Sequence, residues 1–147
     1  WPSAEVASET YSRAAKYCDI IVGNDVEFGF MAGDYEQGLK KAKDLANTTA
    51  KIVIYKMGEL GAITLTADNE IRTGIYPAQA IKPTGAGDSF MGGFVAGLAD
   101  GRPLEEAVLR GSACASMVVA RVGCAPAMPN TLELEDFLRG HAGPTEV

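Results

Sequence analysis

The chain has 147 residues, 47% of them hydrophobic, and its 13 basic and 19 acidic residues give a formal net charge of −6. This length predicts one domain with enough apolar material for a core. The acidic balance, without Lys or Arg runs interleaved with aromatic residues, argues against nucleic acid as a partner, and no apolar run reaches the roughly 18 residues that cross a membrane.

The first part of the chain is predicted to alternate helices with strands. Residues 4–17 are rich in helix formers, and 19–23 (DIIVG) form a short apolar run typical of a buried strand. Residues 24–33 predict a capped helical turn. An amphipathic helix over 34–47 and a second strand over 51–58 follow.

The second part is predicted to hold a hairpin and helices. Two alternating runs within 61–80 flank the turn signal Asp68-Asn69, which predicts a β-hairpin. Long helical patterns cover 103–123 and 132–140, each ending in glycine. Strands that alternate with helices favour an α/β layered sheet. Two or three parallel-type strands plus a hairpin make a small sheet, so we expect the C-terminal half of a larger domain.

The three cysteines, Cys18, Cys114 and Cys124, are far apart and odd in number, which argues against a disulfide framework. The start of the chain also lacks the pattern of a signal peptide. We therefore expect a reducing, cytoplasmic setting. The only histidine, His141, lies in a polar tail, so we expect neither Ser–His nor Cys–His catalysis and no histidine-rich metal site.

One stretch, IKPTGAGDSFMGGFVAG over 81–97, combines a glycine-rich turn with the start of a helix. The turn Gly85-Ala86-Gly87 would expose several backbone N–H groups at the positive end of the helix, which suits an anion. Asp88 lies at the junction, where its carboxylate can accept a proton from a substrate hydroxyl. The alternative is that Asp88 is an ordinary N-cap after a glycine-rich turn.

The same stretch places Gly92, Gly93 and Gly97 inside the predicted helix. A glycine in a helix interior costs about 1 kcal/mol relative to alanine. We therefore expect these three to permit close packing on a neighbouring helix. The stretch matches neither GxxxxGK[ST] nor the full GxGxxG, so neither nucleotide fingerprint applies.

KPTGAGDSFMGGFVAGL resembles the C-terminal signature of the ribokinase-like (PfkB-type) carbohydrate kinases. The resemblance implies a ribokinase-like layered α/β sheet, with residues 1–147 as the C-terminal portion of one kinase domain, without its sugar-binding half and lid. It implies ATP-dependent phosphorylation of a sugar or sugar-acid hydroxyl. In that family the backbone of Gly85, Ala86 and Gly87 would form the anion hole, and Asp88 would be the catalytic base.

The resemblance also implies a Mg²⁺ site. NDVE, from Asn24 to Glu27, matches the family's N-x-x-E motif, which organises Mg²⁺ and phosphate through water. A capping box explains the same residues equally well, with Asn24 as N-cap and Glu27 at the third helical position. Both can hold, because Mg²⁺ often keeps several waters and one carboxylate can suffice.

KMGELGA over 56–62 matches the family's strand-ending segment, which approaches the nucleotide phosphates. The resemblance implies phosphate-side positions for Gly58 and Gly61. Many members carry threonine where this chain has Lys56, and a lysine there could contact ATP phosphate directly. The alternative is a solvated lysine at a strand end.

GSACASMVVARVGCAPAMP over 111–129 matches the small-residue helix and loop that border the adenine site of the family. The resemblance makes Ser112, Gly123 and Ala125 neighbours of the adenine ring. Small residues also serve ordinary helix packing, so both interpretations stay open. Trp1-Pro2, KPTGAGDSFMGG and VGCAPAMP resemble one subgroup, the sugar-acid kinases of inositol breakdown.

Lys82 departs from the family pattern, because many relatives have an aspartate there that helps to hold an activating monovalent cation. Lysine cannot ligate K⁺. We therefore expect the Lys82 ammonium to take the place of the cation and support the anion-hole loop. Activity that depended strictly on K⁺ would contradict this expectation.

The leading hypothesis is an ATP-dependent sugar kinase. Two alternatives remain: a non-catalytic fragment that binds nucleotide at most, and a different sugar or nucleoside kinase of the same fold. Without neighbouring strands the sheet would have an unpaired edge, so we expect the isolated chain to self-associate or to pair with a missing N-terminal half.

Overall fold

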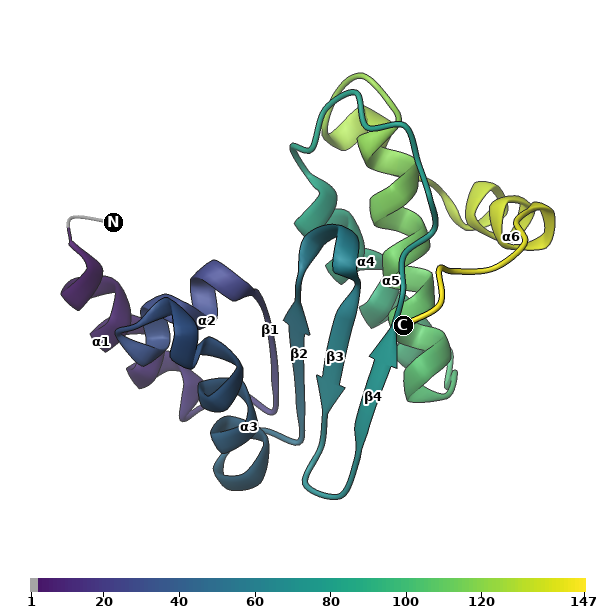
Figure 1. The fold of residues 1–147 in the computed structure, drawn as a ribbon. Helices are drawn as coiled ribbons and strands as arrows, with labels where there is room; N and C mark the ends of the chain where they lie inside the picture. Colours follow the sequence, from purple (N-terminus) through teal and green to yellow (C-terminus); the bar gives the residue numbers. More distant parts are fainter. Residues whose placement is uncertain (1–2) are drawn as a thin grey trace. The chain divides into compact units, whose positions relative to one another are not determined.

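The computed structural model describes residues 3–147, so Trp1 and Pro2 lie outside the described part. The chain forms two compact units, Trp1–Arg72 and Thr73–Val147. Helices α1 to α3 belong to the first unit, and α4 to α6 belong to the second (Figure 1). No helix within residues 3–147 has the length and apolar character needed to cross a membrane.

The first unit contains the helices and strands predicted for the start of the chain, with different ends. The single helix expected over 34–47 is split. Asp34 accepts a hydrogen bond from the Glu36 N–H and starts a separate 3₁₀ turn, so α3 begins only at Gly38. The elements are α1 (Ala4–Ala15), β1 (Ile20–Asn24), α2 (Asp25–Ala32), the 3₁₀ turn η1 (Tyr35–Gln37), α3 (Gly38–Thr48) and β2 (Ile52–Lys56).

The strands form one sheet of order β1-β2-β3-β4, with β3 over Ala62–Leu65 and β4 over Glu70–Thr73. β1 and β2 are parallel, whereas β2 and β3 are antiparallel. The sequence predicted the β3–β4 hairpin but not the antiparallel pairing of β2 with β3. A 3₁₀ turn, η2 (Gly58–Leu60), makes that connection.

The predicted hairpin over 61–80 is also too long, because β4 ends at Thr73. Beyond it, two carbonyl groups are bonded by serine side chains of the second unit rather than by a strand. The Ser112 hydroxyl donates to the Gly74 carbonyl over 3.4 Å, and the Ser116 hydroxyl donates to the Tyr76 carbonyl over 2.6 Å. Ile75, between these two residues, is bonded to Thr145, whose N–H donates to the Ile75 carbonyl over 2.8 Å. The residues after Thr73 therefore have partners outside the hairpin.

The core of the first unit lies between the sheet and helices α2 and α3. Val53 of β2 and Ile63 of β3 are almost fully buried there, together with Phe28 of α2. The Phe28 ring packs on Tyr55, with ring centroids 5.5 Å apart. This apolar layer fixes α2 directly after β1, which positions the N-terminus of α2 at the end of that strand.

The second unit contains α4 (Ala86–Ala99), α5 (Leu104–Val119), a 3₁₀ turn η3 (Ala125–Ala127) and α6 (Thr131–Gly140). The helix predicted over 103–123 ends four residues early. The Arg121 N–H bonds the Val118 carbonyl in a turn, and Gly123 has a φ of 115° that no helix can adopt. The closing helix is confirmed, with its start one residue earlier.

Close packing of α4 on α5, visible in Figure 1, explains two of the three helix glycines. A Cβ at Gly93 would lie 2.7 Å from Cys114 Sγ, and one at Gly97 would lie 3.0 Å from Ala107 Cα. The expectation for Gly92 is wrong, because a Cβ there meets nothing within 4 Å of the described residues. Gly92 faces away from α5 and is exposed.

Candidate functional site

The glycine-rich turn places Gly85, not Asp88, at the N-cap of α4. Gly85 has a φ of 91° and makes no side-chain capping bond. A side chain disfavours this left-handed backbone, so glycine is the residue that fits. Asp88 is therefore the third residue of the helix, and the expectation that it is the N-cap is wrong. Gly87 lies inside the first turn rather than before it.

Four backbone N–H groups at the start of α4 divide into two that are bonded and two that are free within residues 3–147. The Ala86 N–H bonds the Pro83 carbonyl over 3.2 Å, and the Ser89 N–H bonds the Gly85 carbonyl over 2.9 Å. The N–H groups of Gly87 and Asp88 have no partner within residues 3–147. Free amides at the positive end of a helix form a site for an anion. This narrows the predicted anion hole to the Gly87 and Asp88 amides.

The Asp88 side chain lies on the same turn and is exposed. Its carboxylate makes no hydrogen bond or ion pair within the described part of the chain. Asp88 therefore supplies a backbone N–H and a carboxylate that both lack a partner within residues 3–147. Two free amide donors, which suit an anion, and a carboxylate able to accept a proton lie together at this helix end.

The segment before the anion loop is held through its backbone. The N–H groups of Ile81 and Lys82 both donate to the Val119 carbonyl at the end of α5, over 2.7 and 3.1 Å. The Lys82 side chain is exposed, and its ammonium forms no ion pair with any residue from 3 to 147. The role predicted for this ammonium therefore stays a prediction.

In the first unit, the candidate metal residues lie where β1 ends. The Glu27 N–H donates to Asn24 Oδ1 over 2.8 Å, and the Asn24 N–H donates to Glu27 Oε2 over 2.7 Å. The capping box is confirmed. Glu27 Oε1 has no bonded partner in the described chain and can still face a hydrated cation. Residues 3–147 contain no cluster of three or more His, Cys, Asp or Glu suited to a metal.

The candidate phosphate-side residues lie beside this capping box. Asn24 and Lys56 are register partners at the ends of the parallel strands β1 and β2. The chain then turns through Gly58 and Gly61, with φ of 60° and 83°, and the Met57 N–H bonds the Gly61 carbonyl over 2.8 Å. The structure thus brings Asn24 and Lys56 together at the carboxyl ends of adjacent parallel strands, where α/β sheets bind ligands.

The three residues predicted beside adenine do not share one environment. Ser112 is buried in α5, and its hydroxyl is bonded to the Gly74 carbonyl. Gly123 is half-buried and Ala125 is exposed, both in the loop that follows α5. Only Gly123 and Ala125 are open to a ligand.

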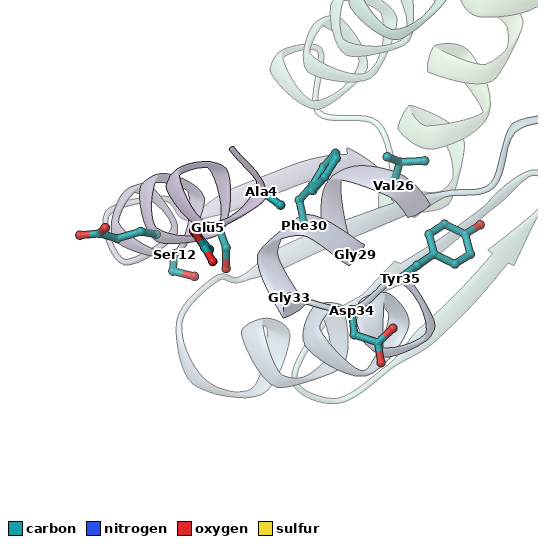
Figure 2. A pocket seen from close by; sticks show the side chains of 11 residues that line it. Ala4, Glu5, Ser12, Val26, Gly29, Phe30, Gly33, Asp34 and Tyr35 are labelled. Carbon is teal, nitrogen blue, oxygen red and sulfur yellow. The ribbon is translucent and has the colours of Figure 1, made fainter. Parts of the chain in front are cut away.

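A separate cavity of about 610 Å³ opens between α1 and α2 (Figure 2). Glu5 of α1, Phe30 of α2 and the following Asp34 and Tyr35 line part of it. The Tyr35 hydroxyl donates to the Asp25 carboxylate, and this bond raises the pKa of Tyr35, so the phenol stays protonated. None of the predicted site residues lines this cavity.

The sequence interpretation missed Cys124 and Arg121. Cys124 Sγ lies 2.6 Å from where a Cβ on Gly85 would be, and the Arg121 guanidinium donates to the Ala127 carbonyl in the loop that carries Cys124. No spacing rule identifies either residue, because the contact joins positions 39 apart in sequence.

Solved structures of known proteins identify the fold of this chain. Ribokinase from Thermotoga maritima matches with a TM-score of 0.79 and 29% identity, over 86% of this chain and 44% of that one. Arabidopsis thaliana ribokinase complexed with ribose and ATP matches with a TM-score of 0.77 and 27% identity, over 85% of this chain and 42% of that one. The chain has the α/β fold of ribokinase, as the sequence predicted.

The family follows from the sequence match. Residues 1–131 match the pfkB family carbohydrate kinase, and the chain belongs to this family. A 5-dehydro-2-deoxygluconokinase of Geobacillus kaustophilus (strain HTA426) is 37% identical over 145 residues, which are 96% of this chain and 43% of that protein. The chain therefore spans less than half the length of this curated relative. The resemblance predicted from KPTGAGDSFMGG is confirmed.

Proposed function

We propose that the whole protein transfers the γ-phosphoryl group of ATP to a hydroxyl of a sugar acid, 5-dehydro-2-deoxygluconate. The observation that carries the proposal is the first turn of α4, where the free amides of Gly87 and Asp88 adjoin the free Asp88 carboxylate. The substrate rests on the 37% identity to a 5-dehydro-2-deoxygluconokinase. ATP as phosphoryl donor is supported by the ATP complex of the Arabidopsis ribokinase.

In the proposed reaction the substrate hydroxyl oxygen attacks the γ-phosphorus, and the bond from that phosphorus to the ADP oxygen breaks. The Asp88 carboxylate accepts the hydroxyl proton. The Gly87 and Asp88 amides donate to oxygens of the transferring group, while Gly85 and Ala86 shape the turn that aims them. Positioning and electrostatics supply most of the catalysis in this reaction class.

The nucleotide and the metal are assigned to residues at the carboxyl ends of β1 and β2 and in the loop after α5. Mg²⁺, which would neutralise phosphate charge, fits Glu27 Oε1 through water, with Asn24 fixing the carboxylate by the capping box. Lys56 and the Gly58–Gly61 turn fit the phosphate side. Gly123 and Ala125 fit the adenine side, whereas the buried Ser112 supports the helix.

The experiment is a substrate panel with the full-length protein and Mg·ATP. ADP release is measured with 5-dehydro-2-deoxygluconate, ribose, fructose and a nucleoside. We expect the sugar acid to give the highest kcat/KM. A nucleoside preference would favour the second candidate of the same fold, and no turnover on any substrate would contradict the proposal. The non-catalytic alternative predicts ATP binding by the isolated chain without turnover.

The exposed edge of the sheet supports a proposed partner. Ile20 of β1 is 36% exposed, whereas Val53 and Ile54 of the neighbouring β2 are fully buried. Parallel strands are normally covered on both faces, and an unpaired edge templates another strand. We propose that β1 mediates self-association of the isolated chain or its pairing with the N-terminal half. Sedimentation of residues 1–147 as a monodisperse monomer, alone and after mixing with the N-terminal half, would contradict this.

A further inference from the structure

The loop after α5, residues 120–128, packs on the N-cap of α4 through one side chain. A Cβ built on Gly85 would lie 2.6 Å from Cys124 Sγ and 3.7 Å from Cys124 Cα. The sulfur therefore fills the space where a side chain at position 85 would lie. Cys124 is a free thiol and is half-buried. A smaller residue at position 124 would leave this space unfilled.

Arg121 holds this loop in shape. Its Nη1 donates to the Ala127 carbonyl over 3.2 Å, and its Nη2 forms an ion pair with Glu133 Oε1 at 3.1 Å. The Ala127 N–H in turn donates to the Cys124 carbonyl over 3.0 Å. The guanidinium therefore ties the far end of the loop to its start, with Cys124 between the two points.

Glu133 can hold Arg121 in place because the Glu133 carboxylate is itself hydrogen-bonded at the N-terminus of α6. It forms the capping box of α6, where Glu133 Oε2 accepts a hydrogen bond from the Asn130 N–H over 2.9 Å. This bond, with the neighbouring Arg121 charge, lowers the pKa of the Glu133 carboxyl. The carboxylate stays charged near neutral pH and keeps both of its bonds.

We propose that Arg121 and Cys124 are positioning residues for the phosphoryl-binding amides. We call this series of contacts the brace: Glu133 in the α6 capping box pairs with Arg121, Arg121 bonds the loop that carries Cys124, and Cys124 packs at Gly85. The free amides of Gly87 and Asp88 follow Gly85 within one helical turn, so the brace fixes where they point. This inference rests on the proposed function, and neither residue is assigned a contact with substrate.

The kinetic test uses the full-length protein with 5-dehydro-2-deoxygluconate and Mg·ATP. A misplacement of about 1 Å can cost up to 10²-fold in rate. We expect Cys124→Ala and Arg121→Gln each to lower kcat about 10-fold with little change in KM for the sugar acid. Cys124→Ser keeps most of the volume and should recover most of the rate. The double variant should be no slower than the worse single variant, because both act through one brace.

A second measurement does not depend on turnover. Backbone ¹⁵N relaxation of Gly87 and Asp88 in the full-length protein should show order parameters falling from about 0.85 toward 0.6 in Cys124→Ala and Arg121→Gln. The matched control is Arg139→Gln, which removes an exposed ion pair with Asp136 on α6. It should leave both amides and kcat unchanged.

Each result of the kinetic and relaxation measurements supports or contradicts the proposed positioning role of Arg121 and Cys124. Rigid Gly87 and Asp88 amides in both variants, or rate losses that multiply in the double variant, would overturn the brace. A thermal unfolding scan identifies a variant that fails to fold, and the other single variant, Cys124→Ala or Arg121→Gln, then decides the proposal. If the wild-type protein phosphorylates nothing, the relaxation data still decide the brace, so its failure is distinguishable from failure of the proposed function.

Discussion

Replacing Asp88 with asparagine should lower kcat of the full-length protein by about 10³-fold, because general-base catalysis contributes roughly 10² to 10⁴. Asparagine keeps the shape of the side chain and the backbone amide, but it cannot accept the hydroxyl proton. The carboxylate is exposed and makes no bond within residues 3–147, so its loss should leave the fold intact. Steady-state ADP release measures the change.

The matched control is Asp100→Asn at the other end of the same helix, where Asp100 is the exposed C-cap of α4. This variant has the same change of charge and should retain wild-type kcat. Nucleotide affinity, measured by calorimetric titration, should change less than about twofold in Asp88→Asn, because the proton acceptor acts on the sugar hydroxyl. Unchanged turnover in Asp88→Asn would remove Asp88 as the base.

Local features of this fold were predictable from sequence, whereas features set by distant contacts were not. The capping box of Asn24 and Glu27 depends on residues three apart, and the structure has it as expected. At the N-cap of α4, by contrast, a side chain on residue 85 would meet Cys124 Sγ, which is 39 residues away. A reader of the sequence assigns the cap to Asp88 by residue preference, because Asp is a favoured N-cap and left-handed glycine caps are rarer.

The same distinction explains the helix glycines and the hairpin. Gly93 and Gly97 could be assigned to packing, but sequence spacing does not separate them from Gly92, which faces away from α5. The hairpin beyond Thr73 was overestimated because the next residues bond distant partners: α5 side chains bond the Gly74 and Tyr76 carbonyls, and Thr145 bonds Ile75. The candidate chemistry at Asp88 came from the glycine-rich turn and the family motif, and the free amides that support it came from the structure.

Replacing Gly85 with alanine should lower kcat by about 10²-fold, through two separate costs. The φ of 91° is unfavourable for a side chain by about 1–2 kcal/mol. The new Cβ would also lie 2.6 Å from Cys124 Sγ, so the turn or the thiol must move. Movement of the turn displaces the Gly87 amide, and small displacements in a preorganised site are costly in rate. Thermal unfolding and ADP release measure the two effects.

Gly92→Ala is the control, because Gly92 lies in the same helix with nothing within 4 Å of an added Cβ. It should raise the free energy of unfolding by up to about 1 kcal/mol, as alanine is the better helix former, and leave kcat unchanged. The double variant Gly85→Ala/Cys124→Ala separates the two costs. Removing the sulfur relieves the clash but not the backbone strain, so stability should recover only in part. Full recovery would show that the left-handed backbone of Gly85 carries no cost, and no recovery would show that the Cys124 contact does not oppose a side chain there.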